Sequence, residues 1–263
     1  MAGKRPIRSL GDKMEKTCQQ PGAEKIPGIL GGMGPEATVD LMQRIIALTP
    51  ALDDVDHLRC IVDNNPKVPS RMKAIIDGDG EDPGPCMADM GKRLEAWGAD
   101  FLVIPCNTAH HYYYNVADAV SIPVVHLVDL VVETVVTNNP GIKKAGVLAS
   151  TAVLITKLYE TRFAARGVDV VYPDAPVQDQ LLGVIRRVKA GETGDKVRQD
   201  FSDICAHLAS KGAEVGILGC TELGIIGGGE LPICSVDAAD VLAREIVAVA
   251  REGKMPHTEL SAP

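Results

Sequence analysis

The sequence predicts an α/β protein with two pseudo-symmetric domains, each a mostly parallel sheet flanked by helices, and a functional site in the cleft between them. Short apolar runs alternate with amphipathic stretches, which is typical of a parallel sheet covered by helices. The alternation restarts halfway along the chain with similar sequence, and such repetition indicates duplicated units. A chain of 263 residues is long enough for two of them.

The elements follow from the apolar periodicity of each segment. In the first half, the expected strands are 28–30, 58–65, 101–105 and 123–128, and the expected helices are 36–47, 87–97 and 110–120. In the second half, the expected strands are 145–150, 168–173, 215–219 and 232–236, and the expected helices are 155–166, 178–189, 197–210 and 238–251. The polar, basic segment 1–25 is expected to be a disordered tail.

The two halves match in detail around a cysteine. The segment Gly98-Ala99-Asp100 precedes Cys106 at the same spacing at which Gly212-Ala213-Glu214 precedes Cys220. Each cysteine comes where an apolar strand ends, which is the edge at which open α/β sheets bind ligands. If the two domains face each other across a cleft, Cys106 and Cys220 lie on opposite walls.

Two matched thiols suit a reaction that needs one acid–base group on each face of a substrate. Racemisation is such a reaction, because one thiolate removes a proton and the opposite thiol supplies another. A duplicated pair of cysteines could instead serve only packing. The residues that follow them, Asn-Thr and Thr-Glu, are poor choices for a core and good choices for binding a ligand or capping a helix.

Composition excludes several other classes of protein. The net charge of −8 gives no basic footprint for nucleic acid. No apolar run approaches the length of a membrane span, and the first residues lack the apolar core of a secretory signal. The seven cysteines form no C-x-x-C pair and no zinc-like cluster, so we expect reduced thiols, no metal site and a cytoplasmic location.

Four motifs in order carry a resemblance to a known family: GILGGMGPEAT (28–38), NNPKVPSR (64–71), PCNTAH (105–110) and GCTEL (219–223). Together they resemble the cofactor-independent aspartate/glutamate racemases, most closely the aspartate racemase branch, from about residue 26 to the C-terminal helix. The resemblance implies a homodimer of two-domain subunits that interconvert L- and D-aspartate, or glutamate, without a cofactor. It implies a first domain of residues 26–125 plus 235–263 and a second domain of residues 126–234. It also implies Cys106 and Cys220 as the catalytic thiols.

The resemblance extends to the substrate-binding residues. Asn107, Thr108 and Thr221 fall where the family binds the α-carboxylate, and Arg71 matches the arginine for the side-chain carboxylate. Lys189 resembles the lysine that accompanies this arginine. The remaining expected site residues are Met33 and Gly34 as pocket wall, Glu222 beside the second thiol, and His110 and Asn65 as supporting residues.

Some residues depart from the family pattern, and other functions remain open. Ser70 stands where aspartate racemases often have Asp, and Cys-Thr-Glu replaces the Cys-Thr-His of bacterial glutamate racemases. Gly-Met-Gly-Pro-Glu-Ala (32–37) also fits a dinucleotide fingerprint, but Asp63 lies too far along the chain to be its acidic partner. The alternatives are related chemistry on this scaffold, namely hydantoin racemisation, maleate isomerisation or arylmalonate decarboxylation, and a binding protein for a small acidic metabolite.

Overall fold

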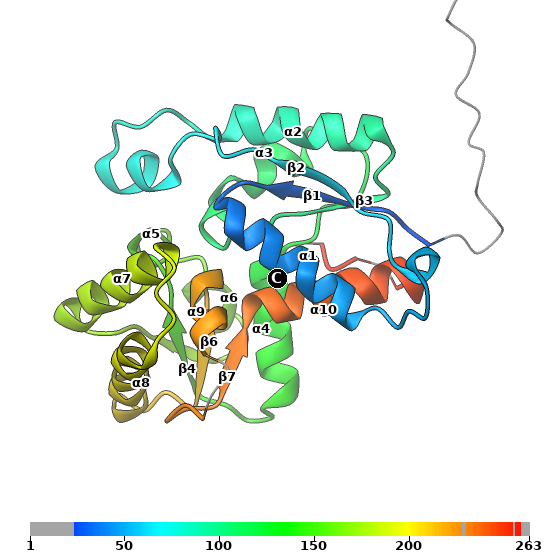
Figure 1. Cartoon of the computed structure of the whole chain (residues 1–263). Coiled ribbons are helices and arrows are strands. Elements are labelled where there is room, and N and C mark those ends of the chain that lie inside the picture. The colour runs from blue at the N-terminus through cyan, green and yellow to red at the C-terminus, as the bar shows by residue number, and fades with distance from the viewer. Residues whose placement is uncertain (1–23, 228–229, 255, 259–263) are drawn as a thin grey trace, which may run out of the picture.

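A computed structural model describes residues 24–227, 230–254 and 256–258, and it contains two parallel sheets flanked by helices (Figure 1). The predicted fold class is confirmed. The first sheet has the strand order β2-β1-β3, and the second has the order β5-β4-β6-β7. The strands are β1 (Pro27–Gly31), β2 (Ile61–Asn64), β3 (Phe101–Val103), β4 (Lys144–Leu148), β5 (Asp169–Val171), β6 (Val215–Leu218) and β7 (Ser235–Asp237). The predicted tail lies outside the described residues except for positions 24 and 25.

The two sheets are copies of one arrangement. In each, the first strand of the half lies in the interior and pairs in parallel with the second strand on one side and the third on the other. In the second sheet β7 then pairs with β6, and in the first sheet a single bridge from Val124 to Leu102 of β3 occupies the same place. The repeat seen in the sequence is therefore a repeat of topology.

Helices connect the strands and cover both faces of each sheet. They are α1 (Pro35–Leu48), α2 (Gly84–Trp97), α3 (Tyr113–Ala117), α4 (Leu127–Asn138), α5 (Thr151–Ile155), α6 (Glu160–Ala164), α7 (Ala175–Lys189), α8 (Asp195–Ser210), α9 (Thr221–Ile226) and α10 (Ala238–Arg251). Among the described residues, no helix combines the length and apolar character needed to cross a bilayer.

Alternation along the strands divides the core into layers. Phe101 and Val103 of β3 face a core that also takes residues from α1, α4, α10 and the second sheet, whereas Leu102 faces a core closed by α2 and α3. In Figure 1, α2 and α3 cover the outer face of the first sheet, and α1 and α10 lie on its other side. The shared central core joins the two halves and fixes the position of one sheet edge relative to the other.

Matched glycines allow the same close packing in both halves. A Cβ on Gly28 would lie 2.8 Å from the Cβ of Ala99, and one on Gly146 would lie 3.0 Å from the Cβ of Ala213. The turn before each of these alanines uses a glycine with positive φ, 105° at Gly98 and 86° at Gly212. These equivalences explain why the Gly-Ala pair recurs in the sequence at the same distance from each cysteine.

Several predicted elements differ in the structure. The expected strand 123–128 is reduced to the bridge at Val124, because α4 begins at Leu127 and buries its β-branched residues between the sheets. The expected helix 155–166 is divided into α5 and α6 at Lys157, which has φ of 51°. Residues 235–237, which the resemblance places in the first domain, pair with β6 as β7 of the second sheet, and the helix after them packs on α1.

Candidate active site

A pocket of about 290 Å³ opens where four equivalent strands end, two from each sheet. The segments after β1, β3, β4 and β6 line it, together with α7 and the turn at 71–76. This is the position at which parallel sheets bind ligands. The structure brings together these sequence-predicted residues: Met33, Gly34, Arg71, Cys106, Asn107, Thr108, Lys189, Cys220, Thr221 and Glu222.

The second thiol has a carboxylate as its hydrogen-bond partner. Cys220 precedes α9, and its Sγ donates to Oε2 of Glu222 at 2.7 Å. Glu222 has only 7% of its side chain exposed, and its other oxygen lies 3.4 Å from Nζ of Lys189. Burial raises the pKa of Cys220 well above its usual value, and the charge and hydrogen bond of Glu222 raise it further. Cys220 is thus held as the protonated thiol, the form that gives up a proton.

The first thiol has a different setting. Cys106 follows β3, and its carbonyl oxygen lies 2.8 Å from Nδ1 of His110. The backbone N–H of Leu127 donates to Nε2 of the same ring at 3.0 Å, so Nδ1 carries the proton and donates to Cys106. Burial lowers the pKa of His110 to about 4, so the ring is neutral near pH 7. His110 does not line the pocket; it fixes the loop that carries Cys106.

The two thiols face the same space. A negative charge on Cys106 contributes to the raised pKa of Cys220 and also acts on Lys189. Burial lowers the pKa of Lys189, and the negative charges of Glu222 and of both cysteines, when ionised, outweigh burial and raise it overall. Ionisation of Cys106 on one wall of the pocket therefore changes the pKa values of Cys220 and Lys189 on the other wall.

Arg71 is held by backbone carbonyls and has no carboxylate partner among the described residues. Nη1 donates to Pro69 O at 3.1 Å, and Nη2 donates to Met33 O at 3.2 Å. Its Nε is buried without a hydrogen-bond partner. A guanidinium that lines a pocket with its charge uncompensated is suited to bind an anion.

Asn65, expected as a supporting residue, does not line the pocket. Its Oδ1 accepts from the N–H of Lys67 at 3.0 Å, and its Nδ2 points to the sulfur atoms of Cys86 and Met90. Asn65 therefore shapes the loop that leads to Arg71.

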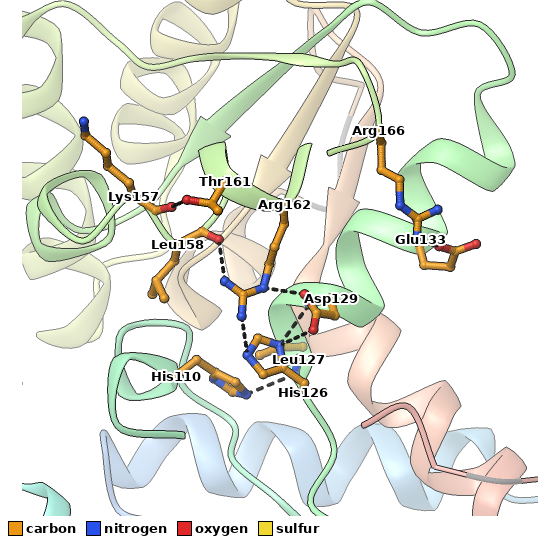
Figure 2. A network of polar contacts seen from close by, with 10 residues as sticks. All are labelled: His110, His126, Leu127, Asp129, Glu133, Lys157, Leu158, Thr161, Arg162 and Arg166. Atoms are coloured by element: carbon orange, nitrogen blue, oxygen red, sulfur yellow. Dashed lines mark hydrogen bonds and ion pairs between the residues drawn. The ribbon is translucent and has the colours of Figure 1, made fainter. Parts of the chain in front are cut away.

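A buried polar network supports the Cys106 loop from the side of α4 (Figure 2). Asp129, only 2% exposed, forms an ion pair with Nε of Arg162, and its Oδ2 lies 3.3 Å from Nδ1 of His126. Nη2 of Arg162 donates to Nε2 of His126 at 2.9 Å. Burial lowers the pKa of His126 to about 2, and the nearby His110 and Arg162 make smaller contributions in the same direction. The ring of His126 packs edge-on against His110, with centroids 5.1 Å apart, so the network fixes the ring that holds Cys106.

Sequence reasoning missed several pocket residues. The apolar part of the wall includes Met72, Ile76, Leu182 and Ile185, and the polar part includes Ser150 and Thr151. The topology could have indicated Ser150, because it follows β4 as Cys106 follows β3. Arg186 also lines the pocket and is exposed. In the described part of the chain, no group of three or more His, Cys, Asp or Glu is arranged to hold a metal ion.

Comparisons with known proteins agree with this arrangement. The family profile described as Asp/Glu/Hydantoin racemase matches residues 30–246. The chain is 29% identical over 230 residues to the broad-specificity amino-acid racemase RacX of Bacillus subtilis (strain 168), covering 84% of this chain and 96% of the relative.

Solved structures show the same fold. The aspartate racemase of Picrophilus torridus aligns with a TM-score of 0.73 at 26% identity, covering 86% of this chain and 94% of that one. The glutamate racemase isoform RacE1 of Bacillus anthracis aligns with a TM-score of 0.64 at 17% identity, covering 90% and 85% of the two chains, a likeness of fold alone.

The fold and the pocket define a class of two-sheet α/β proteins with a cysteine at each of two equivalent strand ends. Within that class, the chain belongs to the Asp/Glu/hydantoin racemase family, and it is a racemase. The resemblance found in the four motifs is confirmed.

Proposed function

We propose that the chain racemises acidic amino acids, L- and D-aspartate above all and glutamate as the alternative, by a two-base mechanism that needs no cofactor. The observation that carries this proposal is the pocket with Cys106 and Cys220 on equivalent strand ends and the uncompensated cation Arg71 beside them. The mechanism and the substrate are inferences from this geometry and from the family resemblance.

In this mechanism one cysteine acts as a thiolate and the other as a thiol. Cys220 donates its S–H to Glu222, so in one direction it is the acid and Cys106 is the base. The Cα–H bond breaks as an S–H bond forms on Cys106, and the carbanion receives the proton of Cys220 on the opposite face. The product has inverted configuration, and the two cysteines have exchanged protonation states. The reverse direction starts from that second state.

The substrate carboxylates would occupy two ends of the pocket. The α-carboxylate would meet the loop donors at Asn107, Thr108 and Thr221, and the side-chain carboxylate would meet Arg71. Glu222 is a carboxylate itself and cannot bind an anionic group; its role is with Cys220 and Lys189.

A second candidate is racemisation of a broader set of amino acids. The name of the Bacillus subtilis relative states broad specificity. In this pocket Lys189 is paired with Glu222, and apolar side chains such as Leu182 and Ile185 form part of the wall. Both features would accommodate a neutral side chain.

The test is an assay of the purified protein with each enantiomer of aspartate and glutamate. Dialysed, chelator-treated protein without visible-range absorbance should racemise aspartate, and thiol alkylation should abolish the activity. Activity that returns only when pyridoxal phosphate is added would contradict the proposed mechanism. Equal rates with aspartate and with neutral amino acids would favour the second candidate.

Arg71→Ala should lower kcat/KM for aspartate about 10- to 150-fold, because a charge-assisted contact to a carboxylate contributes about 1.5–3 kcal/mol. The kcat/KM for alanine, if it is a substrate, should change far less. Arg166→Ala is the control, since Arg166 pairs with Glu133 on the surface and should leave both substrates unaffected. Equal losses of kcat/KM for aspartate and alanine in the Arg71 variant would show that Arg71 does not bind the side-chain carboxylate.

A further inference from the structure

A buried tyrosine from the second half of the chain contacts a pocket residue of the first half. Tyr159 lies between α5 and α6 and is fully buried. Its hydroxyl donates to Oδ1 of Asn107 at 2.6 Å, in the segment just after Cys106. Asn107 is 5% exposed and lines the pocket, whereas Tyr159 does not.

This contact determines which way the Asn107 amide points. A buried hydroxyl must place its proton on an acceptor. Among the described residues, Oδ1 of Asn107 is the acceptor that the Tyr159 hydroxyl reaches. Oδ1 is therefore turned to Tyr159. Nδ2, which donates to none of the described residues, lies at the opposite edge of the planar amide and points away from Tyr159.

We propose that Tyr159 is a positioning residue that holds the Asn107 amide with its NH₂ group toward the substrate carboxylate. The inference rests on the proposed function, in which Asn107 lies at the carboxylate of an amino acid. The opposite amide orientation would present a carbonyl oxygen to that anion and repel it. The Tyr159 hydroxyl in the second half of the chain thus determines whether Asn107 in the first half presents its NH₂ group or its carbonyl oxygen to the substrate.

The loop itself has other supports, so the role of the hydroxyl can be isolated. Oγ1 of Thr108 lies 3.0 Å from Oγ of Ser150 across the two halves, and His110 binds the carbonyl of Cys106. Removing the Tyr159 hydroxyl leaves these contacts and the buried ring in place. The amide of Asn107 then loses the group that selects its orientation.

Tyr159→Phe should raise KM for aspartate about tenfold, the loss of one charge-assisted hydrogen bond, with kcat changed less than about twofold. The matched control is Tyr172→Phe, which removes a hydroxyl that donates to Glu160 at 2.7 Å in the same half but outside the pocket. That control should keep the wild-type KM. A kcat loss with unchanged KM in Tyr159→Phe would overturn the proposal, because a binding orientation would then not be the quantity affected.

Two further measurements separate this proposal from general loss of structure. In an Asn107→Ala background, Tyr159→Phe should add no further rise in KM, since the amide it orients is gone; additive losses would contradict the inference. Asn107→Asp keeps an acceptor for Tyr159 and turns a second carboxylate oxygen to the pocket, so it should bind aspartate more weakly than Asn107→Ala does. Equal or tighter binding by Asn107→Asp would overturn the proposal even if Tyr159→Phe fails to fold.

Calorimetric titration with succinate, a dicarboxylate that cannot be racemised, distinguishes this proposal from the proposed function. Wild-type protein that binds succinate but leaves aspartate unchanged would contradict racemisation of aspartate alone. Weaker succinate binding by Tyr159→Phe than by Tyr172→Phe would still support the orienting role. Equal binding by the two variants, or no binding by the wild type, would overturn it.

Discussion

Cys106→Ala and Cys220→Ala should each lower the rate of racemisation by about 10²–10⁴-fold or more, the range that one positioned acid–base group contributes. Inversion requires proton removal on one face and proton delivery on the other, so neither thiol can replace its partner. Cys234→Ala is the control, because Cys234 is exposed and outside the pocket, and it should retain wild-type activity. The measurement is the change of optical rotation with time, starting from either enantiomer of aspartate.

Isotope exchange then tests the two-base mechanism directly. In D₂O, early turnover should place deuterium in the product while recovered substrate stays largely protiated. A single base serving both faces would label both pools or return the original proton. Within the described residues, Cys220 has a carboxylate partner and Cys106 has none. The two alanine variants should therefore differ, and one should still exchange the α-proton of a single enantiomer. Near wild-type racemisation by either alanine variant would make that cysteine structural.

The repeat explains why so much of the pocket could be predicted from sequence. Strand ends and turn glycines are local features, so Gly98 and Gly212 locate Cys106 and Cys220 without knowledge of packing. The roles of these thiols stay predictions, as do the homodimer, the cytoplasmic location and the exact domain division. What the structure adds is that both thiols line one pocket.

Contacts between distant segments were beyond the reach of sequence patterns. Tyr159 and Asn107 are 52 positions apart, and no periodicity relates them. The sequence patterns did not predict helix α4, because its Val-rich sequence favours a strand. Burial between the two sheets overrides that local preference. Lys189 lines the pocket, and its pairing with Glu222 depends on how α7 packs against α9, which no sequence pattern shows.

Asp129→Ala should lower the free energy of unfolding by about 3–5 kcal/mol, the range expected when one partner of a buried ion pair is removed. The change leaves Arg162 and His126 without the carboxylate that both contact (Figure 2). Urea unfolding followed by circular dichroism measures the loss.

Glu133→Ala is the matched control on the same helix. Glu133 pairs with Arg166 at 2.8 Å, but both side chains are about one-third exposed, and exposed pairs contribute about 1 kcal/mol or less. Adding Arg162→Met to Asp129→Ala should recover part of the lost stability, because an apolar side chain then replaces a guanidinium whose contact with Asp129 is gone. If Asp129→Ala is no more destabilised than Glu133→Ala, the network is not what fixes α4 and the His110 ring. If the double variant is less stable than the single one, the cost lies in lost packing and not in the loss of the Asp129–Arg162 ion pair.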